Sequence, residues 1–197
     1  MTRIAFVRHG ITDWNIEGRC QGQMDVPLNE EGRKQAAAVA SRIAGETWDA
    51  VYASDLSRAA ETAEGIGRAV GLPVVYDRRL REVYCGRIEG MTEAERVAKW
   101  GELWYEQDYG METHEALRER GLACVGEIAE RHPGGRVIVV SHGWLLTQTL
   151  KGLLQDEAAG DRLLNTSVSV VCRPADRWTL ELFNCTRHLP AGAAQSV

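Results

Sequence analysis

Two buried-strand patterns that each end in a histidine constrain the fold of this chain more than any other feature. Residues 4–7 (IAFV) and residues 137–140 (VIVV) are short runs of apolar, β-forming residues, which are typical of strands covered on both faces. His9 and a glycine come just after the first run, and His142 and a glycine come just after the second. Because ligands bind at the carboxyl ends of strands in an open α/β sheet, we expect both histidines at one functional edge.

Helical and strand patterns alternate along the rest of the chain. Helices are predicted from Asn29 to about Ala44, from Ser54 or Asp55 to Val70, around residues 117–128, and over residues 145–154. Further strands are predicted over residues 48–53, 74–76, 136–140, 168–172 and 178–183. This order predicts a single-domain α/β three-layer sandwich with a mostly parallel sheet, helices on both faces and a C-terminal antiparallel edge. We expect the domain to cover residues 1–190 and residues 191–197 to form a frayed tail.

Composition and charge argue against several classes of function. The chain has 197 residues and a net charge of −5, so no global basic field attracts nucleic acid or anionic lipid. No apolar run approaches the roughly 20 residues of a membrane span, and a strand pattern follows Met1 without a signal peptide. The five cysteines are widely spaced and form no C-x-x-C motif, which favours reduced thiols. We therefore expect a cytoplasmic protein without nucleic-acid or membrane partners.

Cationic side chains are expected to gather at the functional edge. Arg8 precedes His9, and Arg58 lies within about the first turn of the helix that follows residues 48–53. A helix N-terminus with free amides and an arginine favours an anion. Together with His142, these residues predict a compact pocket whose natural ligand is a phosphoryl group.

A carboxyl group is the remaining requirement for acid–base chemistry on a phosphate ester. Glu82 and Glu89 both lie near glycines in the segment LREVYCGRIEG. In an apolar, anion-binding setting a carboxyl can hold a proton and donate it to a leaving oxygen. Both residues are candidates from the sequence pattern.

These residues lie in motifs that resemble the histidine phosphatase, or phosphoglycerate mutase-like, superfamily and its small broad-specificity phosphatase branch. The matching motifs are R-H-G at residues 8–10, G-R-x-Q-G-x-x-D-x-P-L at 18–28, S-D-L-x-R-A-x-x-T-A at 54–63, L-x-E-x-x-x-G-x-x-E-G at 80–90 and S-H-G at 141–143. Their order over roughly residues 3–154 makes the resemblance specific, whereas R-H-G alone would be a weak signal.

The resemblance implies a metal-independent phosphomonoester phosphatase without a cofactor, acting on a small-molecule phosphomonoester, with a homodimer as one expected assembly. His9 would form a phosphohistidine, and Glu82, not Glu89, would be the general acid/base. Arginines and an imidazolium would supply the positive charge in place of a metal. The implied catalytic residues are His9, Glu82, His142, Arg8 and Arg58, and the implied substrate-binding residues are Arg8, Asn15, Gln21, Gly22, Arg58, Glu82, His142 and Gly143.

Three alternative functions stay open. A cofactor-dependent phosphoglycerate mutase shares the core but typically carries a longer insertion with more basic residues. Here the only arginines and lysines between Glu82 and Thr113 are Arg87, Arg96 and Lys99, which favours the phosphatase. A specialised phosphatase for α-ribazole phosphate or a sugar bisphosphate is the second, because residues 100–115 match the family only loosely. A phospholigand-binding module is the third, and the intact catalytic set argues against it.

Overall fold

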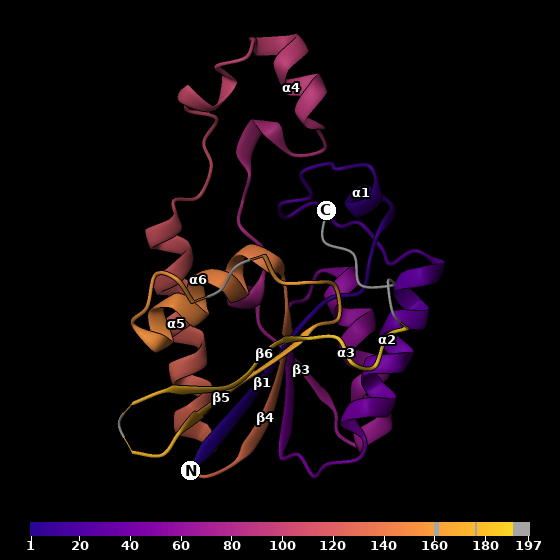
Figure 1. Ribbon diagram of the computed structural model, residues 1–197, viewed down its shortest axis with the longest axis vertical. Helices are drawn as coiled ribbons and strands as arrows, with labels where there is room; N and C mark the ends of the chain where they lie inside the picture. Colours follow the sequence, from indigo (N-terminus) through magenta and orange to yellow (C-terminus); the bar gives the residue numbers. More distant parts are fainter. Residues whose placement is uncertain (160–161, 176, 191–197) are drawn as a thin grey trace.

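A six-stranded sheet forms the centre of the computed structural model, which describes residues 1–159, 162–175 and 177–190 (Figure 1). The strands are β1 (Thr2–Arg8), β2 (Ala50–Ala53), β3 (Val74–Tyr76), β4 (Arg136–Ser141), β5 (Val168–Arg173) and β6 (Thr179–Cys185). Their order is β3-β2-β4-β1-β5-β6, with parallel pairs as far as β1 and antiparallel pairs from β1 to β5 and from β5 to β6. The predicted parallel sheet with an antiparallel C-terminal edge is confirmed. The tail expected at residues 191–197 lies outside the described residues.

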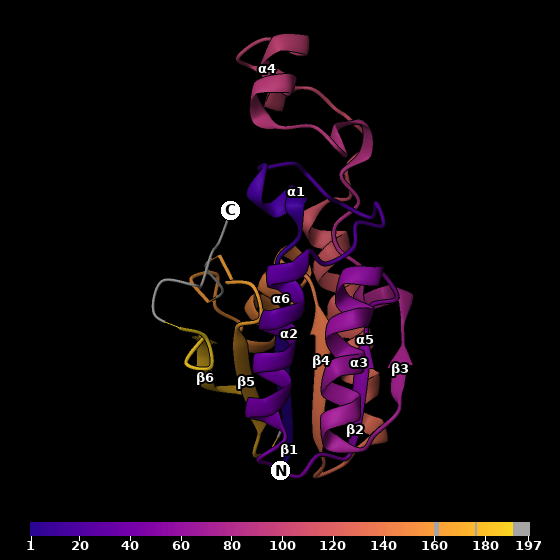
Figure 2. The ribbon, with the colours of Figure 1, turned by 90° about the vertical axis from the view of Figure 1, so that its right-hand side faces the viewer.

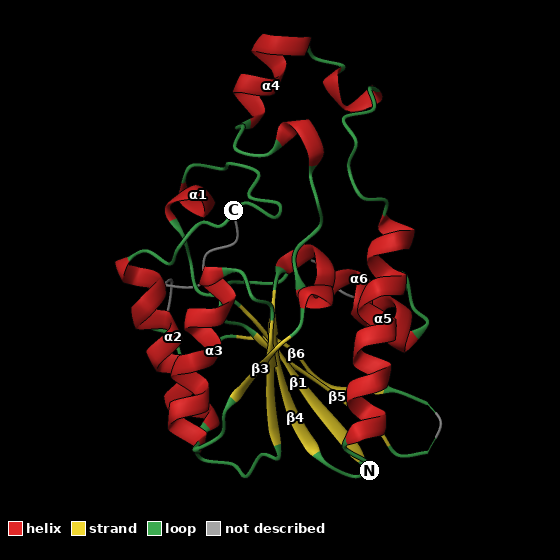
Figure 3. Cartoon of the chain, turned by 180° about the vertical axis from the view of Figure 1, so that it is seen from behind, coloured by secondary structure: helices red, strands yellow, loops and turns green. Residues whose placement is uncertain are grey.

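Helices cover both faces of this sheet, as predicted (Figure 3). The pair α2 (Glu30–Ile43) and α3 (Ser57–Val70) packs on one face, and the pair α5 (His114–Arg131) and α6 (Gly143–Leu154) packs on the other. Two short helices, α1 (Asp13–Ile16) and α4 (Glu93–Trp100), lie beyond the carboxyl edge of the sheet. No helix in the described part of the chain is both long and apolar enough to cross a membrane.

The alternation of side chains along β1 explains why its sequence is apolar throughout. Ile4 and Phe6 enter the core cluster beneath α5 and α6, whereas Ala5 and Val7 enter the cluster beneath α2 and α3. All four side chains are at most 1% exposed. A strand covered on both faces needs apolar residues at odd and even positions alike.

The ends of the two helices on the first face show where local sequence decides structure. The side chain of Asn29 accepts a hydrogen bond from the backbone N–H of Gly32 at 2.8 Å and begins α2, as predicted. Helix α3 ends at Gly71, whose φ of +73° is the left-handed conformation that glycine adopts most easily. Both boundaries agree with the sequence patterns.

The start of α3 differs from the prediction that Ser54 or Asp55 caps it. The N-cap residue is Leu56, which makes no side-chain capping bond. Asp25, 32 positions away in sequence from Ser57, instead accepts the N–H of Ser57 at 2.7 Å. The carboxylate of Asp55 accepts two hydrogen bonds from Arg81 at 2.6–2.7 Å. Asp55 therefore forms an ion pair with a residue distant in sequence and does not cap the helix.

Residues 84–113, called here the excursion, project away from the carboxyl edge of the sheet beyond α1 (Figure 2). The excursion contains α4 and two 3-10 turns, Gly86–Ile88 and Trp104–Glu106. Aromatic contacts organise it: the Trp100 and Tyr109 rings lie 4.5 Å apart, and the Arg96 guanidinium lies 4.4 Å from the Trp104 ring. The sequence predicts only an irregular, aromatic-rich segment here.

Candidate active site

The register between β1 and β4 brings the two histidines together. Val7 pairs with Val140 and Arg8 pairs with Ser141, so the residues after them leave adjacent strand ends. The imidazole rings of His9 and His142 lie 5.1 Å apart between centroids. They are 2% and 0% exposed, respectively. The expectation that both histidines share one sheet edge is confirmed.

The backbone determines which nitrogen of His9 is available. Nδ1 lies 2.7 Å from the carbonyl oxygen of Gly10, which can only accept a hydrogen bond. Nδ1 therefore carries the proton, and Nε2 keeps a free lone pair. Burial, together with the charges of Arg58 and Arg8, lowers the pKa of His9 well below its usual value. The ring is thus a neutral imidazole at neutral pH, the form that can attack an electrophile.

The neighbouring histidine is oriented by a serine. His142 Nε2 lies 2.8 Å from Ser54 Oγ, and Ser54 Oγ accepts the N–H of Leu56 at 3.3 Å. We assign the hydroxyl hydrogen of Ser54 to the bond with Nε2, which places the proton of the neutral ring on Nδ1. Burial and the charge of Arg58 lower the pKa of His142 well below its usual value. Without a ligand His142 is therefore held toward its neutral form, and the imidazolium expected to face a phosphoryl group stays a prediction.

Two buried guanidinium groups carry the positive charge instead. Arg8 Nη1 donates to the carbonyl of Leu163 at 2.5 Å, and Arg58 donates to the carbonyls of Met24 and Gly22, each at 2.8 Å. Burial lowers the pKa of both arginines to about 10, which leaves them cationic at neutral pH. Two charges held in a buried site favour an anionic ligand.

Three buried N–H donors of this cluster have no protein partner in the described part of the chain. They are Nε of Arg8, Nε of Arg58 and Nδ1 of His142. Buried donors in native proteins are almost always satisfied, so unpaired ones indicate a missing acceptor. A phosphoryl group in transfer presents three equatorial oxygens and can supply three acceptors.

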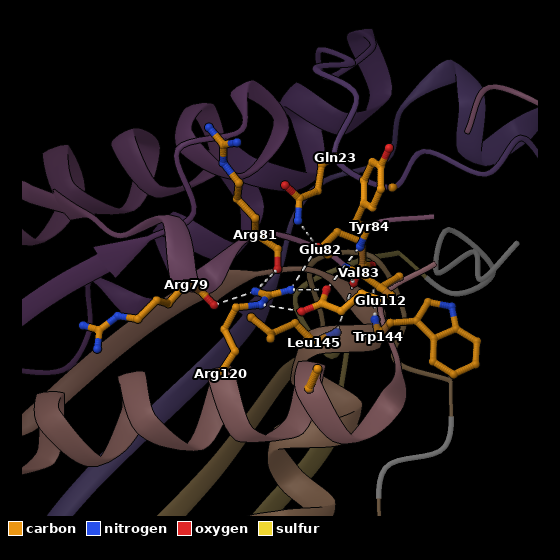
Figure 4. Close-up of polar contacts among 12 residues, drawn as sticks. Gln23, Arg79, Arg81, Glu82, Val83, Tyr84, Glu112, Arg120, Trp144 and Leu145 are labelled. Carbon is orange, nitrogen blue, oxygen red and sulfur yellow. Dashed lines mark hydrogen bonds and ion pairs between the residues drawn. The ribbon is translucent and has the colours of Figure 1, made fainter. Parts of the chain in front are cut away.

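The structure separates the two candidate carboxylates. Glu82 is 9% exposed and lines the cavity in front of His9, where its carboxylate accepts backbone N–H groups of Val83, Trp144 and Leu145 at 2.9–3.1 Å (Figure 4). Glu89 instead accepts the N–H groups of Gln23 and Cys85 at 2.8 and 3.1 Å, and it is not among the cavity-lining residues. Glu82 is thus the candidate carboxylate that lines the cavity, whereas Glu89 joins two loops.

A cavity of about 690 Å³ opens at this edge and collects most of the predicted binding residues. His142 lies behind the cavity lining, fully buried. The predicted residues that line the cavity are Arg8, His9, Asn15, Gln21, Gly22, Arg58, Glu82 and Gly143. Among residues 1–159, 162–175 and 177–190, no group of three or more His, Cys, Asp or Glu side chains is placed to hold a metal ion.

Sequence reasoning misses one wall of this cavity. Trp144, Thr147, Gln148 and Lys151 line it from α6, and Arg162 lines it from the loop that follows. The spacing of the α6 residues is helical, so one face of the helix that begins after the S-H-G motif could have predicted them. Nothing in the local sequence around Arg162 indicates a site.

Another residue that the sequence reasoning misses contacts the backbone of His9. Asn165 is fully buried, and its side-chain amide donates to the carbonyl of His9 at 3.0 Å. The backbone N–H of Thr166 donates to the same carbonyl at 3.2 Å. Asn165 lies more than 150 positions away in sequence from His9, so only the tertiary fold shows the contact.

Comparisons with known proteins agree with this arrangement. A model of the histidine phosphatase superfamily (branch 1) matches residues 4–186. The metal-independent phosphoserine phosphatase of Arabidopsis thaliana is 38% identical over 200 residues, covering 96% of this chain and 84% of that protein. A probable phosphoglycerate mutase of Salmonella choleraesuis (strain SC-B67) is 34% identical over 209 residues, covering 98% of this chain and 97% of that protein.

Solved structures show the same fold. The mycobacterial glucosyl-3-phosphoglycerate phosphatase in complex with VO3 is similar with a TM-score of 0.83 and 31% sequence identity, covering 92% of this chain and 98% of the other. Family model, relatives and fold all point in one direction. The chain therefore belongs to the histidine phosphatase superfamily, branch 1, and its enzyme class is that of the phosphoric monoester hydrolases.

Proposed function

We propose that this protein is a metal-independent phosphatase of small phosphomonoesters that works through a phosphohistidine on His9. Nε2 of His9 attacks phosphorus, the bond from phosphorus to the ester oxygen breaks, and Glu82 gives its proton to that leaving oxygen. Water then attacks the phosphohistidine, Glu82 takes a proton from it, and His9 and inorganic phosphate are released. The observation that carries the proposal is the free Nε2 of His9 beside three unpartnered buried donors.

Arg8, Arg58 and His142 are proposed to stabilise the charge on the transferring group. Their free donors are rigidly held, because each side chain is also bonded to protein groups. Donors fixed in place before the reaction lower the barrier most effectively, since they need no reorganisation. Asn15, Gln21, Gly22 and Gly143 are proposed to contact the substrate from the cavity wall.

The contacts of the basic residues in the excursion favour hydrolysis over transfer of the phosphoryl group to a second position on the substrate. Arg87 donates to the carbonyl of Asp108, and Lys99 lies 4.6 Å from the Trp100 ring. Arg96 reaches the cavity lining but is also engaged by the Trp104 ring. These cations are used in the excursion's own packing, so water is the proposed acceptor. The names of the phosphoserine and glucosyl-3-phosphoglycerate phosphatases support an alkyl phosphate as substrate.

Trapping the intermediate tests the nucleophile. Rapid quench with labelled substrate should yield an acid-labile, base-stable phosphoprotein in the wild type and in the control variant His132→Ala. His132 is not among the cavity-lining residues, and its Nε2 lies 3.0 Å from the hydroxyl of Tyr52. His9→Ala should give no adduct. Label that survives acid, or that persists in His9→Ala, would falsify the assignment.

Matched glutamine variants test the acid/base. Proton donation matters most for poor leaving groups such as alkoxides and little for p-nitrophenolate. Glu82→Gln should therefore lower kcat/KM for an alkyl phosphate far more than for p-nitrophenyl phosphate, and Glu89→Gln should change both little. Equal effects of the two variants would withdraw the role of Glu82.

The reaction class is tested with 3-phosphoglycerate. The wild type should release inorganic phosphate from it, whereas rapid isomerisation stimulated by 2,3-bisphosphoglycerate would identify a mutase.

A further inference from the structure

Arg120, on α5, holds the backbone segment that carries Glu82 (Figure 4). Its Nη1 donates to the carbonyl oxygens of Arg79 and Arg81, each at 2.7 Å, and its Nη2 donates to the carbonyl of Glu82 at 3.2 Å. One guanidinium thus bonds three carbonyls within four consecutive residues. Bonding of this kind needs the planar, fork-shaped donor set of arginine.

Glu112 fixes the guanidinium from its other side. Its carboxylate accepts from Arg120 Nε at 2.9 Å and from Nη2 at 2.7 Å, and the two side chains are only 19% and 17% exposed. Burial acts to raise the pKa of Glu112, but the hydrogen bonds and charge of Arg120 lower it overall. Glu112 also exchanges hydrogen bonds with the backbone of Tyr84, at the base of the excursion. The pair is therefore well ordered in one geometry.

The segment that Arg120 holds lies outside the sheet and the long helices. Its remaining carbonyl, that of Leu80, accepts from Ser141 Oγ at 2.6 Å, and the carbonyl of Glu82 accepts from Gln23 Nε2 at 3.1 Å in addition to Arg120. The opposite end of the Glu82 side chain is bonded to the N-terminus of α6 through Trp144 and Leu145. Glu82 is thus fixed at its backbone by α5 and at its carboxylate by α6.

We propose that Arg120, oriented by Glu112, is a positioning residue that aims Glu82 at the leaving oxygen. The inference rests on the proposed role of Glu82 as general acid. Proton transfer requires the two oxygens to lie within about 2.6–3.2 Å of each other. A misplacement of about 1 Å can slow a reaction on the order of a hundredfold. Loss of the Arg120 bonds loosens the backbone end of Glu82, so its carboxylate keeps only the bonds to the N–H groups of Val83, Trp144 and Leu145 and can shift relative to the leaving oxygen.

The test compares two leaving groups in Arg120→Met and Arg120→Lys. We expect kcat/KM for an alkyl phosphate to fall by about tenfold to a hundredfold in Arg120→Met, with p-nitrophenyl phosphate changed by less than about threefold, because that leaving group needs little protonation. Arg120→Lys keeps the charge beside Glu112 but cannot donate to three carbonyls at once, so it should show the same selectivity, less strongly. A wild-type ratio of the two rates in both variants would overturn the proposal.

Arg118→Met is the matched control. Arg118 lies on the same helix and forms a comparable two-pronged ion pair with Glu157, at 2.6 and 3.0 Å, without a hydrogen bond to residues 79–82. Its Nη2 also donates to the cavity-lining Gln148 at 2.9 Å, but a change there would affect the binding of both substrates and not the ratio of their rates. It should leave the ratio of the two rates unchanged. Arg120 also contributes charge near His142, but an effect through His142 acts on the phosphoryl group and would slow both substrates equally, which would overturn the proposal. Should Arg120→Met not fold, Arg120→Lys decides.

Failure of the inference is distinguishable from failure of the proposed function. If Glu82→Gln shows the leaving-group selectivity and the Arg120 variants do not, Glu82 is the acid and Arg120 only stabilises the fold. If Glu82→Gln lacks the selectivity, the acid assignment itself is wrong. Circular dichroism and thermal unfolding of each variant establish that the compared proteins are folded.

Discussion

The cluster of two arginines and two histidines at the sheet edge and the excursion beyond it differ in how far their side chains are buried. The cluster consists of buried side chains, three at the ends of core strands and Arg58 in the first turn of α3: Arg8, His9, Arg58 and His142 are at most 7% exposed. The excursion has a helix, α4, in which no residue is buried, and ring contacts among its own residues organise the part around α4. The base of the excursion is joined to the core, because Cys85, Ile88 and Tyr109 are buried in the core cluster. The comparison is therefore between a buried cluster and a helix that buries none of its own residues.

The largest expected difference between the two regions is in local stability. Amides of β1 and β4 should exchange hydrogen only through global unfolding, with a free energy near the ~5–15 kcal/mol of a whole domain. Amides of α4 should exchange through local opening at a much lower free energy, because α4 buries no residue. Native-state hydrogen exchange followed by NMR measures both. Equal protection of β4 and α4 would show that the excursion is part of the core.

Arginine substitutions sharpen the comparison at the level of catalysis. Arg58→Ala removes a fixed donor to the transferring group and should lower kcat for p-nitrophenyl phosphate about a hundredfold, or about 3 kcal/mol, as loss of one oxyanion donor does. Lys99→Ala in α4 removes a cation that lies over Trp100 and is not among the cavity-lining residues, so its rate should stay within about twofold of wild type. Steady-state kinetics of both variants provide the check, and a fully active Arg58→Ala would remove Arg58 from the mechanism.

Acid should destabilise the cluster through its histidines. His9 and His142 have pKa values well below the usual value when folded, and these return to about 6.5 in the unfolded chain. Below about pH 6.5 the unfolded state therefore binds more protons, and the free energy of unfolding falls as the pH decreases. Urea unfolding between pH 7 and pH 5 should show a shallower fall in His9→Asn/His142→Asn than in wild type. An identical slope would mean that the two rings titrate in the fold as they do in the unfolded chain.

The smallest effect is expected from the packing of the excursion itself. Trp104→Ala removes the contact with the Arg96 guanidinium and a hydrogen bond from Trp104 Nε1 to Glu93 at 2.7 Å. A cation–π contact of this kind contributes about 0.5–1 kcal/mol at an exposed site. Trp104 is only partly buried where it packs against the core cluster, so the Tm of the domain should change little while hydrogen exchange in α4 accelerates. A large drop in Tm would show that the excursion stabilises the whole domain.

The two regions also differ in how far the sequence predicts them. The strands around His9 and His142 are predictable because strand burial leaves a direct apolar pattern, and the motif resemblance adds Arg58 and Glu82. The functional edge follows from the parallel pairing of β1 with β4. These features depend on local sequence patterns and on one rule of sheet topology, so they can be predicted without knowledge of tertiary contacts.

What the sequence does not predict depends on contacts between distant segments. The bond from Asn165 to the His9 carbonyl, the capping of α3 by Asp25 and the clamp made by Arg120 join residues 32 to 156 positions apart. The lowered pKa of His142 also depends on distant segments, because it arises from burial and from the nearby arginine charges. Side-chain types at these positions carry no local signal of their partners.

The hydrogen bond from His9 Nδ1 to the Gly10 carbonyl has a consequence for how such an enzyme diverges. Many catalytic histidines are oriented by a distant carboxylate, which a single substitution can delete. Here the acceptor is a main-chain oxygen, an atom that every amino acid supplies, so no replacement of a neighbouring side chain can abolish it. Position 10 itself is restricted, because a Cβ there would lie 2.5 Å from the carbonyl oxygen of Gly32. The nitrogen proposed to attack is thereby fixed independently of the neighbouring side chains, so residues of the cavity wall can differ without changing it.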